Sequence, residues 1–190
     1  MIPAWNAVGV LPPIRPGKPG NDPDRSPYKA PLYQLVEYFT STPERLAIIK
    51  GLLAYRKALH GAGIVTGFQW LDGSFMEQVE ALESRPPNDI DVVTFFTIPE
   101  GASQQTLARD YGDLFNQAKA KEKFSVDAYT FILGEPTTPY RVKLVSYWHS
   151  MWSHRRNGQW KGFIQVDLDP TEDLAAHKVL EAKGQDGGLP

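Results

Sequence analysis

The spacing of apolar and polar positions predicts alternating helices and strands from residue 43 onward. Apolar residues recur at helical spacing over residues 43–60, with Ser41 or Thr42 as the N-cap, Pro43 in the first turn and Gly61 at the end. Short apolar runs bounded by glycine, proline or polar residues predict strands. These strands are expected at residues 67–75, 89–98 and 124–133, and in the second half of 154–168 after a turn at Asn157-Gly158.

The remaining segments predict further helices and one ambiguous stretch. Helices are expected at residues 102–121 and 173–183, and a short helical or irregular piece at 76–88. Residues 140–152 fit a helix or a strand equally well. The order of elements indicates an α/β (α+β) domain with a small mixed β-sheet flanked by helices.

The first 31 residues have a different composition from the rest of the chain. Half of the sixteen prolines lie there, which rules out a long helix. We therefore expect a proline-rich N-terminal arm at residues 1–31 and a single domain at residues 32–190. Apolar side chains at Trp5, Val8, Val10 and Leu11 are the parts of this arm most suited to docking on the domain.

Composition narrows the class of protein. Apolar residues make up 42% and charged residues 22%, and the formal net charge is −2, so no global basic field favours nucleic acid. The absence of cysteine excludes disulfides and thiolate zinc sites. No signal-peptide pattern and no apolar run of about 18 residues are visible. We expect a cytoplasmic protein with no membrane partner.

Three aspartates interrupt apolar strands. Asp89 and Asp91 lie two residues apart in one predicted strand, so they share a face, and Asp127 stands alone in another. Ionised carboxylates are costly in such surroundings unless they face water or a cation. Side-chain oxygens of this kind suit Mg²⁺ or Mn²⁺, and two such ions serve phosphoryl-type displacements. Taken singly, the same residues also fit a solvent-facing strand or a surface cap.

Two further stretches are candidates for nucleotide binding. Gly73 and Ser74 follow a predicted strand, and such a turn presents free backbone N–H groups to phosphate, although a plain turn has the same sequence. Residues 141–161 contain basic and aromatic side chains but no acid, which suits phosphate contact and base stacking. Arg155 and Arg156 are the candidates there. The simpler interpretation is a core-packed aromatic helix followed by a solvated hairpin.

The segments "LDGSF", "NDIDVV" and "SVDAYTF" resemble the Gly-Ser, Asp-x-Asp and third-Asp motifs of the DNA polymerase β-like nucleotidyltransferases. They are in particular similar to the small minimal members found in bacterial toxin–antitoxin and phage-defence loci. Together, "NAVGVLPPI", "WLDGSF", "DIDVV" and "RNGQWKGFI" further resemble one bacterial family of such proteins, and this likeness covers most of the chain. The resemblance implies the nucleotidyltransferase fold. It also implies that Gly73 and Ser74 bind triphosphate, Asp89 and Asp91 ligate both metals, and Asp127 ligates one metal and helps activate the acceptor hydroxyl.

One departure concerns the segment between Ser74 and Asp89, which is longer than usual in minimal members and carries Pro86-Pro87. Whether this segment gates the site is open at the level of sequence.

The expected function is a metal-dependent transfer of NMP from an NTP to a hydroxyl, with Mg²⁺ or Mn²⁺ as cofactor. The acceptor would be a partner protein or an RNA such as tRNA that docks from outside, without DNA sequence readout. One alternative is a non-catalytic, antitoxin-like binding module that keeps the fold and neutralises a partner by contact. Another is metal-dependent phosphodiester hydrolysis, which the same acids would support.

Overall fold

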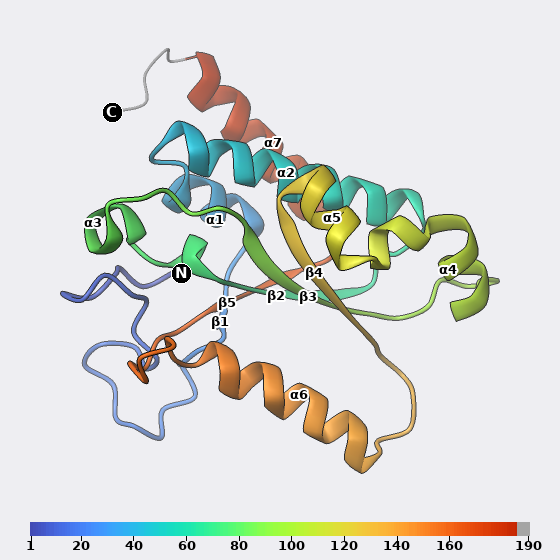
Figure 1. Cartoon of the computed structure of the whole chain (residues 1–190), viewed down its shortest axis with the longest axis horizontal. Coiled ribbons are helices and arrows are strands. Elements are labelled where there is room, and N and C mark those ends of the chain that lie inside the picture. Colours follow the sequence, from blue (N-terminus) through green and yellow to red (C-terminus); the bar gives the residue numbers. More distant parts are fainter. Residues whose placement is uncertain (186–190) are drawn as a thin grey trace.

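A five-stranded mixed sheet organises the computed structural model, which describes residues 1–185. The strand order is β1-β5-β2-β3-β4, in which β2 runs antiparallel to both neighbours and the other two pairings are parallel (Figure 1). The strands are β1 Tyr28–Lys29, β2 Gly67–Asp72, β3 Ile90–Phe96, β4 Val126–Ile132 and β5 Ile164–Asp167.

Helices cover both faces of this sheet (Figure 1). One face carries α1 Leu32–Phe39, α2 Pro43–Gly61, α5 Gln117–Phe124 and α7 Pro170–Gln185. The opposite face carries α6 Pro139–Trp152. Shorter elements are the 3₁₀ turns Ser74–Met76 and Gly112–Phe115 and the helices α3 Val79–Glu83 and α4 Gln104–Tyr111. This architecture confirms the expected mixed α+β class.

Strand β3 shows why its sequence reads as an almost unbroken apolar run. Ile90 and Val92 pack into the larger core beneath the α1/α2/α5/α7 layer. Val93 and Phe95 pack into a second, aromatic-rich core against α6. Because both faces are covered, the strand is apolar on both faces except at Asp91 and Thr94. Asp91 lies on the same face as Val93, at the end of the strand beyond this aromatic core.

Helix boundaries follow from capping residues. The helix predicted over residues 43–60 is confirmed as α2, in which the Thr42 hydroxyl accepts a hydrogen bond from the Arg45 backbone N–H at 3.3 Å. The ambiguous stretch at 140–152 forms α6, with Thr138 as N-cap and Pro139 at N1. The single helix predicted over residues 102–121 is wrong. The chain there forms α4, a 3₁₀ turn and α5, because Asn116 caps a new helix by accepting from the Lys119 N–H.

The segment predicted as an arm packs onto the domain. Val10 and Leu11 are fully buried, and the Trp5 indole Nε1–H donates to the Met76 carbonyl at 2.8 Å, whereas Val8 remains exposed. Residues 28–29 add β1 to the sheet beside β5. Residues 1–31 are therefore continuous with the folded body. Residues 186–190 of the predicted domain lie outside the described part of the chain.

Within residues 1–185, no helix combines the length and the apolarity that crossing a membrane requires.

Candidate active site

Sheet register aligns three aspartates on neighbouring strands. Asp72 at the end of β2 pairs with Asp91 on β3, and Asp91 pairs with Asp127 on β4. We call Asp72, Asp91 and Asp127 the carboxylate row. Asp89 directly precedes β3, one residue before the strand begins. The structure thus brings together all three predicted aspartates and adds Asp72, which the sequence had not singled out as a site residue.

The carboxylate row lines a cleft of about 690 Å³ that is rich in charge. Its acidic lining consists of the row together with Glu77, Glu83 and Asp89. Its basic lining consists of Arg85, Lys121, Arg155, Arg156 and Lys161. Gly73 and Ser74 also line this cleft, so the predicted phosphate-binding turn and the predicted metal ligands share one cavity.

Gly73 is required where β2 turns against Asp91. Its φ is +87°, a left-handed conformation that side chains rarely adopt. A Cβ at this position would lie 2.8 Å from the Asp91 Oδ2 atom. The chain then enters the 3₁₀ turn, with the Met76 N–H donating to the Gly73 carbonyl at 3.1 Å. Absence of a side chain therefore lets the Gly-Ser backbone approach the Asp91 carboxylate directly.

Asp72 is neutralised by a buried lysine. The Lys161 ammonium lies 2.9 Å from Asp72 Oδ1 and 3.0 Å from Glu77 Oε1, and all three side chains are buried. Burial raises the pKa of Asp72 to about 6, although the Lys161 charge opposes this rise. Burial also acts to lower the pKa of Lys161, but Asp72 and Glu77 hold it above its ordinary value. Lys161 therefore stays charged as an internal counterion.

Asp91, in the centre of the carboxylate row, lacks such a counterion. No hydrogen bond or ion pair from any residue in 1–185 reaches its partly buried carboxylate. Burial raises the pKa of Asp91 to about 7, and the charges of Asp72, Asp127 and Asp89 add to this rise. Negative charge is thus concentrated around Asp91, and only the more distant Lys161 charge opposes the rise in its pKa. A bound cation or a proton would relieve it.

Two other carboxylates near Asp91, those of Asp89 and Asp127, each contact a side chain of α5. Asp89 Oδ2 lies 2.5 Å from the Lys121 ammonium. Asp127 Oδ1 accepts a hydrogen bond from the Gln117 amide, which also donates to the Tyr129 hydroxyl at 2.8 Å. The flanking acids therefore differ from Asp91 in having protein partners.

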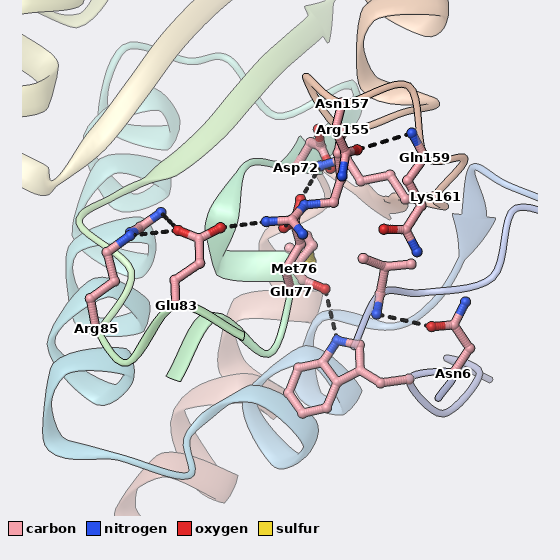
Figure 2. A network of polar contacts seen from close by, with 12 residues as sticks. Asn6, Asp72, Met76, Glu77, Glu83, Arg85, Arg155, Asn157, Gln159 and Lys161 are labelled. Carbon is pink, nitrogen blue, oxygen red and sulfur yellow. Dashed lines mark hydrogen bonds and ion pairs between the residues drawn. The ribbon is translucent and has the colours of Figure 1, made fainter. Parts of the chain in front are cut away.

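The two candidate arginines occupy different environments. Arg155 Nε lies 2.9 Å from Glu77 Oε2, and its guanidinium also contacts Glu83, which pairs with Arg85 at 2.7 Å (Figure 2). Arg155 thus braces the wall of the cleft. Arg156 is exposed, and no ion pair reaches it from the described residues. Arg156 is accordingly the arginine available to an anionic ligand.

Two of the aromatic side chains in residues 141–161, Trp148 and Trp152, are part of the hydrophobic core. Trp148 and Trp152 are 4% and 3% exposed and pack against β3 and Phe163, which confirms the simpler interpretation for this helix. Tyr147 and Trp160 remain exposed.

The long segment after Ser74 is anchored in its first half. The buried guanidinium of Arg45, from α2, donates to the Phe75 carbonyl at 2.7 Å and to the Glu77 carbonyl at 2.5 Å. It also pairs with Glu80 at 2.6 Å. These contacts, with the Trp5 bond to Met76, fix residues 75–80 beneath the Gly-Ser turn. This half of the segment is a support for the site.

The donor set fits a hard divalent cation. Its candidate ligands, Asp89, Asp91 and Asp127, are all carboxylates, as Mg²⁺ and Mn²⁺ prefer. Among residues 1–185, no three acidic or histidine side chains already converge as a complete ligand set. The uncompensated charge on Asp91 nevertheless supplies a physical reason for a cation to bind there. Asp89 lies two residues away along the chain, and Asp127 is the direct cross-strand neighbour of Asp91.

Comparison with known proteins gives a family assignment. A family model described as a family of unknown function (DUF6932) matches residues 3–167. The matched range contains the whole carboxylate row, the Gly-Ser turn and Lys161. Searches of the curated proteins and of the solved structures gave no match.

Proposed function

The chain belongs to the DUF6932 family, and we propose that it is a metal-dependent nucleotidyltransferase of the minimal DNA polymerase β-like kind. One observation carries the proposal: an uncompensated carboxylate, Asp91, lies at the centre of a row of aspartates and directly against the Gly73-Ser74 turn. The motif resemblance and the order of strands around these residues support it further.

In the proposed reaction, the oxygen of an acceptor hydroxyl attacks the α-phosphorus of an NTP. The bond from this phosphorus to the bridging oxygen breaks, and pyrophosphate leaves. Asp89, Asp91 and Asp127 would hold one or two Mg²⁺ or Mn²⁺ ions, which neutralise phosphate charge and polarise the reacting oxygens when bound. Gly73 and Ser74 would bind the triphosphate through backbone N–H groups and the hydroxyl, and Arg156 would add a cation at the cleft.

Asp127 has a second proposed role. Among the three strands that carry the carboxylate row, it lies on the one farthest from the Gly-Ser turn, so an acceptor would approach it from the side opposite the triphosphate. There its carboxylate would take the proton from the acceptor hydroxyl. The acceptor is proposed to be a partner protein or an RNA, and the setting a toxin–antitoxin or phage-defence system, on the strength of the motif resemblance.

The test is transfer of label from each α-³²P-NTP, with Mg²⁺ or Mn²⁺, to total RNA and to cellular protein. We expect transfer that Asp91→Asn abolishes and Asp110→Asn leaves intact, because Asp110 lies in an exposed ion pair away from the cleft. Transfer that survives Asp91→Asn would contradict the proposal.

Two other results would favour the alternatives. Tight partner binding without any transfer, unaffected by Asp91→Asn, would indicate a binding module. Metal-dependent shortening of unlabelled RNA without label incorporation would indicate a phosphodiesterase.

A further inference from the structure

One face of α5 reaches both carboxylates that flank Asp91. Gln117 and Lys121 are four residues apart, so they lie on the same side of the helix, one turn from each other. Gln117 contacts Asp127, and Lys121 contacts Asp89. We call Gln117 and Lys121 the α5 pair.

Backbone packing fixes the position of α5 independently of these contacts. Ala120 and Phe124, on the adjoining face of the helix, are buried in the larger core. A Cβ on Gly51 of α2 would lie only 2.0 Å from the Phe124 carbonyl oxygen, so the two helices touch through their backbones. Ser125 then takes a left-handed conformation and leads directly into β4. The α5 pair is therefore held over the site whether or not its own polar contacts form.

Lys121 differs from the neighbouring lysines of the same helix. Its side chain is 55% exposed, yet its ammonium lies 2.5 Å from Asp89. Asp89, and more weakly Asp127 and Asp91, raise the pKa of Lys121. Lys119 instead pairs with Asp113, and Lys123 lies over the Phe124 ring at 5.2 Å from its centroid. Lys121 is thus the α5 lysine whose charge acts on the proposed metal ligands.

We propose that Lys121 is a built-in competitor for the divalent cation, holding Asp89 in the metal-free protein and leaving it when the cation binds. The proposal rests on the metal site of the proposed function. An ammonium and a divalent ion on the same carboxylate repel each other, so binding of the ion expels the lysine. Because the Lys121 side chain is itself exposed, its ammonium moves into water at little cost when it leaves Asp89.

Displacement couples metal binding to a change in the cleft. Before the ion binds, the Lys121 ammonium offsets part of the negative charge that Asp89 adds near Asp91. Once released, the ammonium stays within the same cavity, where it is available to the phosphates of a substrate. Lys121 is therefore a positioning residue: it contacts Asp89 in the metal-free protein and the substrate phosphates when the metal is bound.

The experiment is a titration with Mn²⁺ alone, followed by EPR, on the whole chain without nucleotide. Lys121→Met removes the charge and keeps the length of the side chain, and Lys123→Met is the matched control on the same helix. We expect Lys121→Met to bind Mn²⁺ about fivefold to tenfold more tightly than wild type, since one competing charge close to the ion is removed. Lys123→Met should stay within about twofold, because its charge is farther from the ligands and screened.

Two further variants separate the possible failures. Gln117→Ala removes a hydrogen bond without removing charge, so Mn²⁺ affinity should change little. Equal tightening in Gln117→Ala and Lys121→Met, or equal affinity in Lys121→Met and Lys123→Met, would overturn the competitor role while leaving the metal site in place. Saturable binding should also disappear in Asp91→Asn. Absence of saturable binding in both wild type and Lys121→Met would overturn the metal site itself, and the competitor role with it.

Discussion

Two polar clusters lie at strand β2, and they differ in whether their buried charges have a counterion and hydrogen-bond partners. On one face, near Gln69, the fully buried Arg56 guanidinium donates to Asp173 Oδ1 at 2.5 Å, to Gln69 Oε1 at 2.7 Å and to the Asp167 carbonyl at 2.9 Å. On the other face, at the end of the same strand, Asp72 stands beside Asp91, whose carboxylate has no partner among the described residues.

We interpret the paired charges around Arg56 as stabilising the fold, and the unpaired carboxylate of Asp91 as part of a functional site. Burying an ion costs several kcal/mol unless hydrogen bonds and a counterion offset the cost, and the Arg56 cluster provides both. The carboxylate row provides a counterion for Asp72 and leaves Asp91 without one. Unrelieved repulsion at one point in an otherwise well-paired protein is characteristic of a site prepared for a ligand.

The largest effect should come from breaking the matched cluster. We expect Arg56→Met to lower the free energy of unfolding by about 3–5 kcal/mol, because the buried Asp173 loses its guanidinium partner and keeps only the His60 imidazole, 3.0 Å from its Oδ2. Asp91→Asn, at the unmatched site, should leave stability unchanged or raise it, since it removes a repelled charge. Urea denaturation at pH 7.5 measures both. Equal losses in the two variants would refute the comparison.

A smaller loss of stability is expected when a side chain is added at Gly73 in the Gly-Ser turn. Gly73→Ala should cost about 2–3 kcal/mol, since it adds backbone strain at positive φ and a contact of 2.8 Å with Asp91 Oδ2. Gly134→Ala is the control: its φ is +81° but nothing lies within 4 Å of its Cβ, so strain alone should cost about 1 kcal/mol. Adding Asp91→Ala to Gly73→Ala should recover the excess loss. Equal denaturation midpoints for the two single variants would refute the clash.

The pH dependence of stability sharpens the contrast further. Asp91 takes up its proton near pH 7 in the folded protein and near its ordinary value of 3.8 in the unfolded chain. The folded state therefore binds more protons between these values, and stability falls as the pH rises from about 4 to about 7. Between pH 5.5 and pH 7.5, the free energy of unfolding of the wild type should fall by about 2 kcal/mol more than that of Asp91→Asn. Parallel denaturation profiles for the two proteins would contradict the assignment.

The smallest effect should distinguish the two arginines. Arg155→Ala should lower the free energy of unfolding by about 1 kcal/mol, because the largely buried Glu77 loses a partner. Arg156→Ala should leave stability within about 0.5 kcal/mol, since exposed substitutions away from packed features cost little. NTP affinity, measured by thermal shift with Mn²⁺, should fall in Arg156→Ala. A stability loss in Arg156→Ala equal to that in Arg155→Ala would show that both arginines brace the wall.

Local pattern was enough to predict the strands that carry the site. The apolar alternation around Asp91 and Asp127 indicated two strands, and β3 and β4 follow within a residue or two. The role of Asp72 was missed because its partner, Lys161, is 89 residues away in sequence. The available signals were an acid directly before Gly-Ser and a lone lysine between Trp160 and Gly162. Neither of these reveals which distant residue will pair with it.

Two helical errors have local causes. Helix α1 was not predicted because it follows Pro31 in the proline-rich segment, although Leu35, Val36 and Phe39 have helical spacing. The break between α4 and α5 was missed because the helical periodicity of residues 102–121 outweighed the cap at Asn116. The packing of residues 1–31 depends on distant contacts such as Trp5 with Met76, which composition does not reveal.

The position of β5 has a consequence for how the protein is made. Among the five strands, β5 is the last in sequence, yet it lies between β1 and β2 and pairs with both. During synthesis, residues 1–163 are all made before β5 exists, so until then β1 has no neighbour to join. Asp72 likewise leaves the exit tunnel long before Lys161 can neutralise it. The sheet and its internal counterion are therefore completed together, late in synthesis, and a chain cut short before residue 161 retains neither.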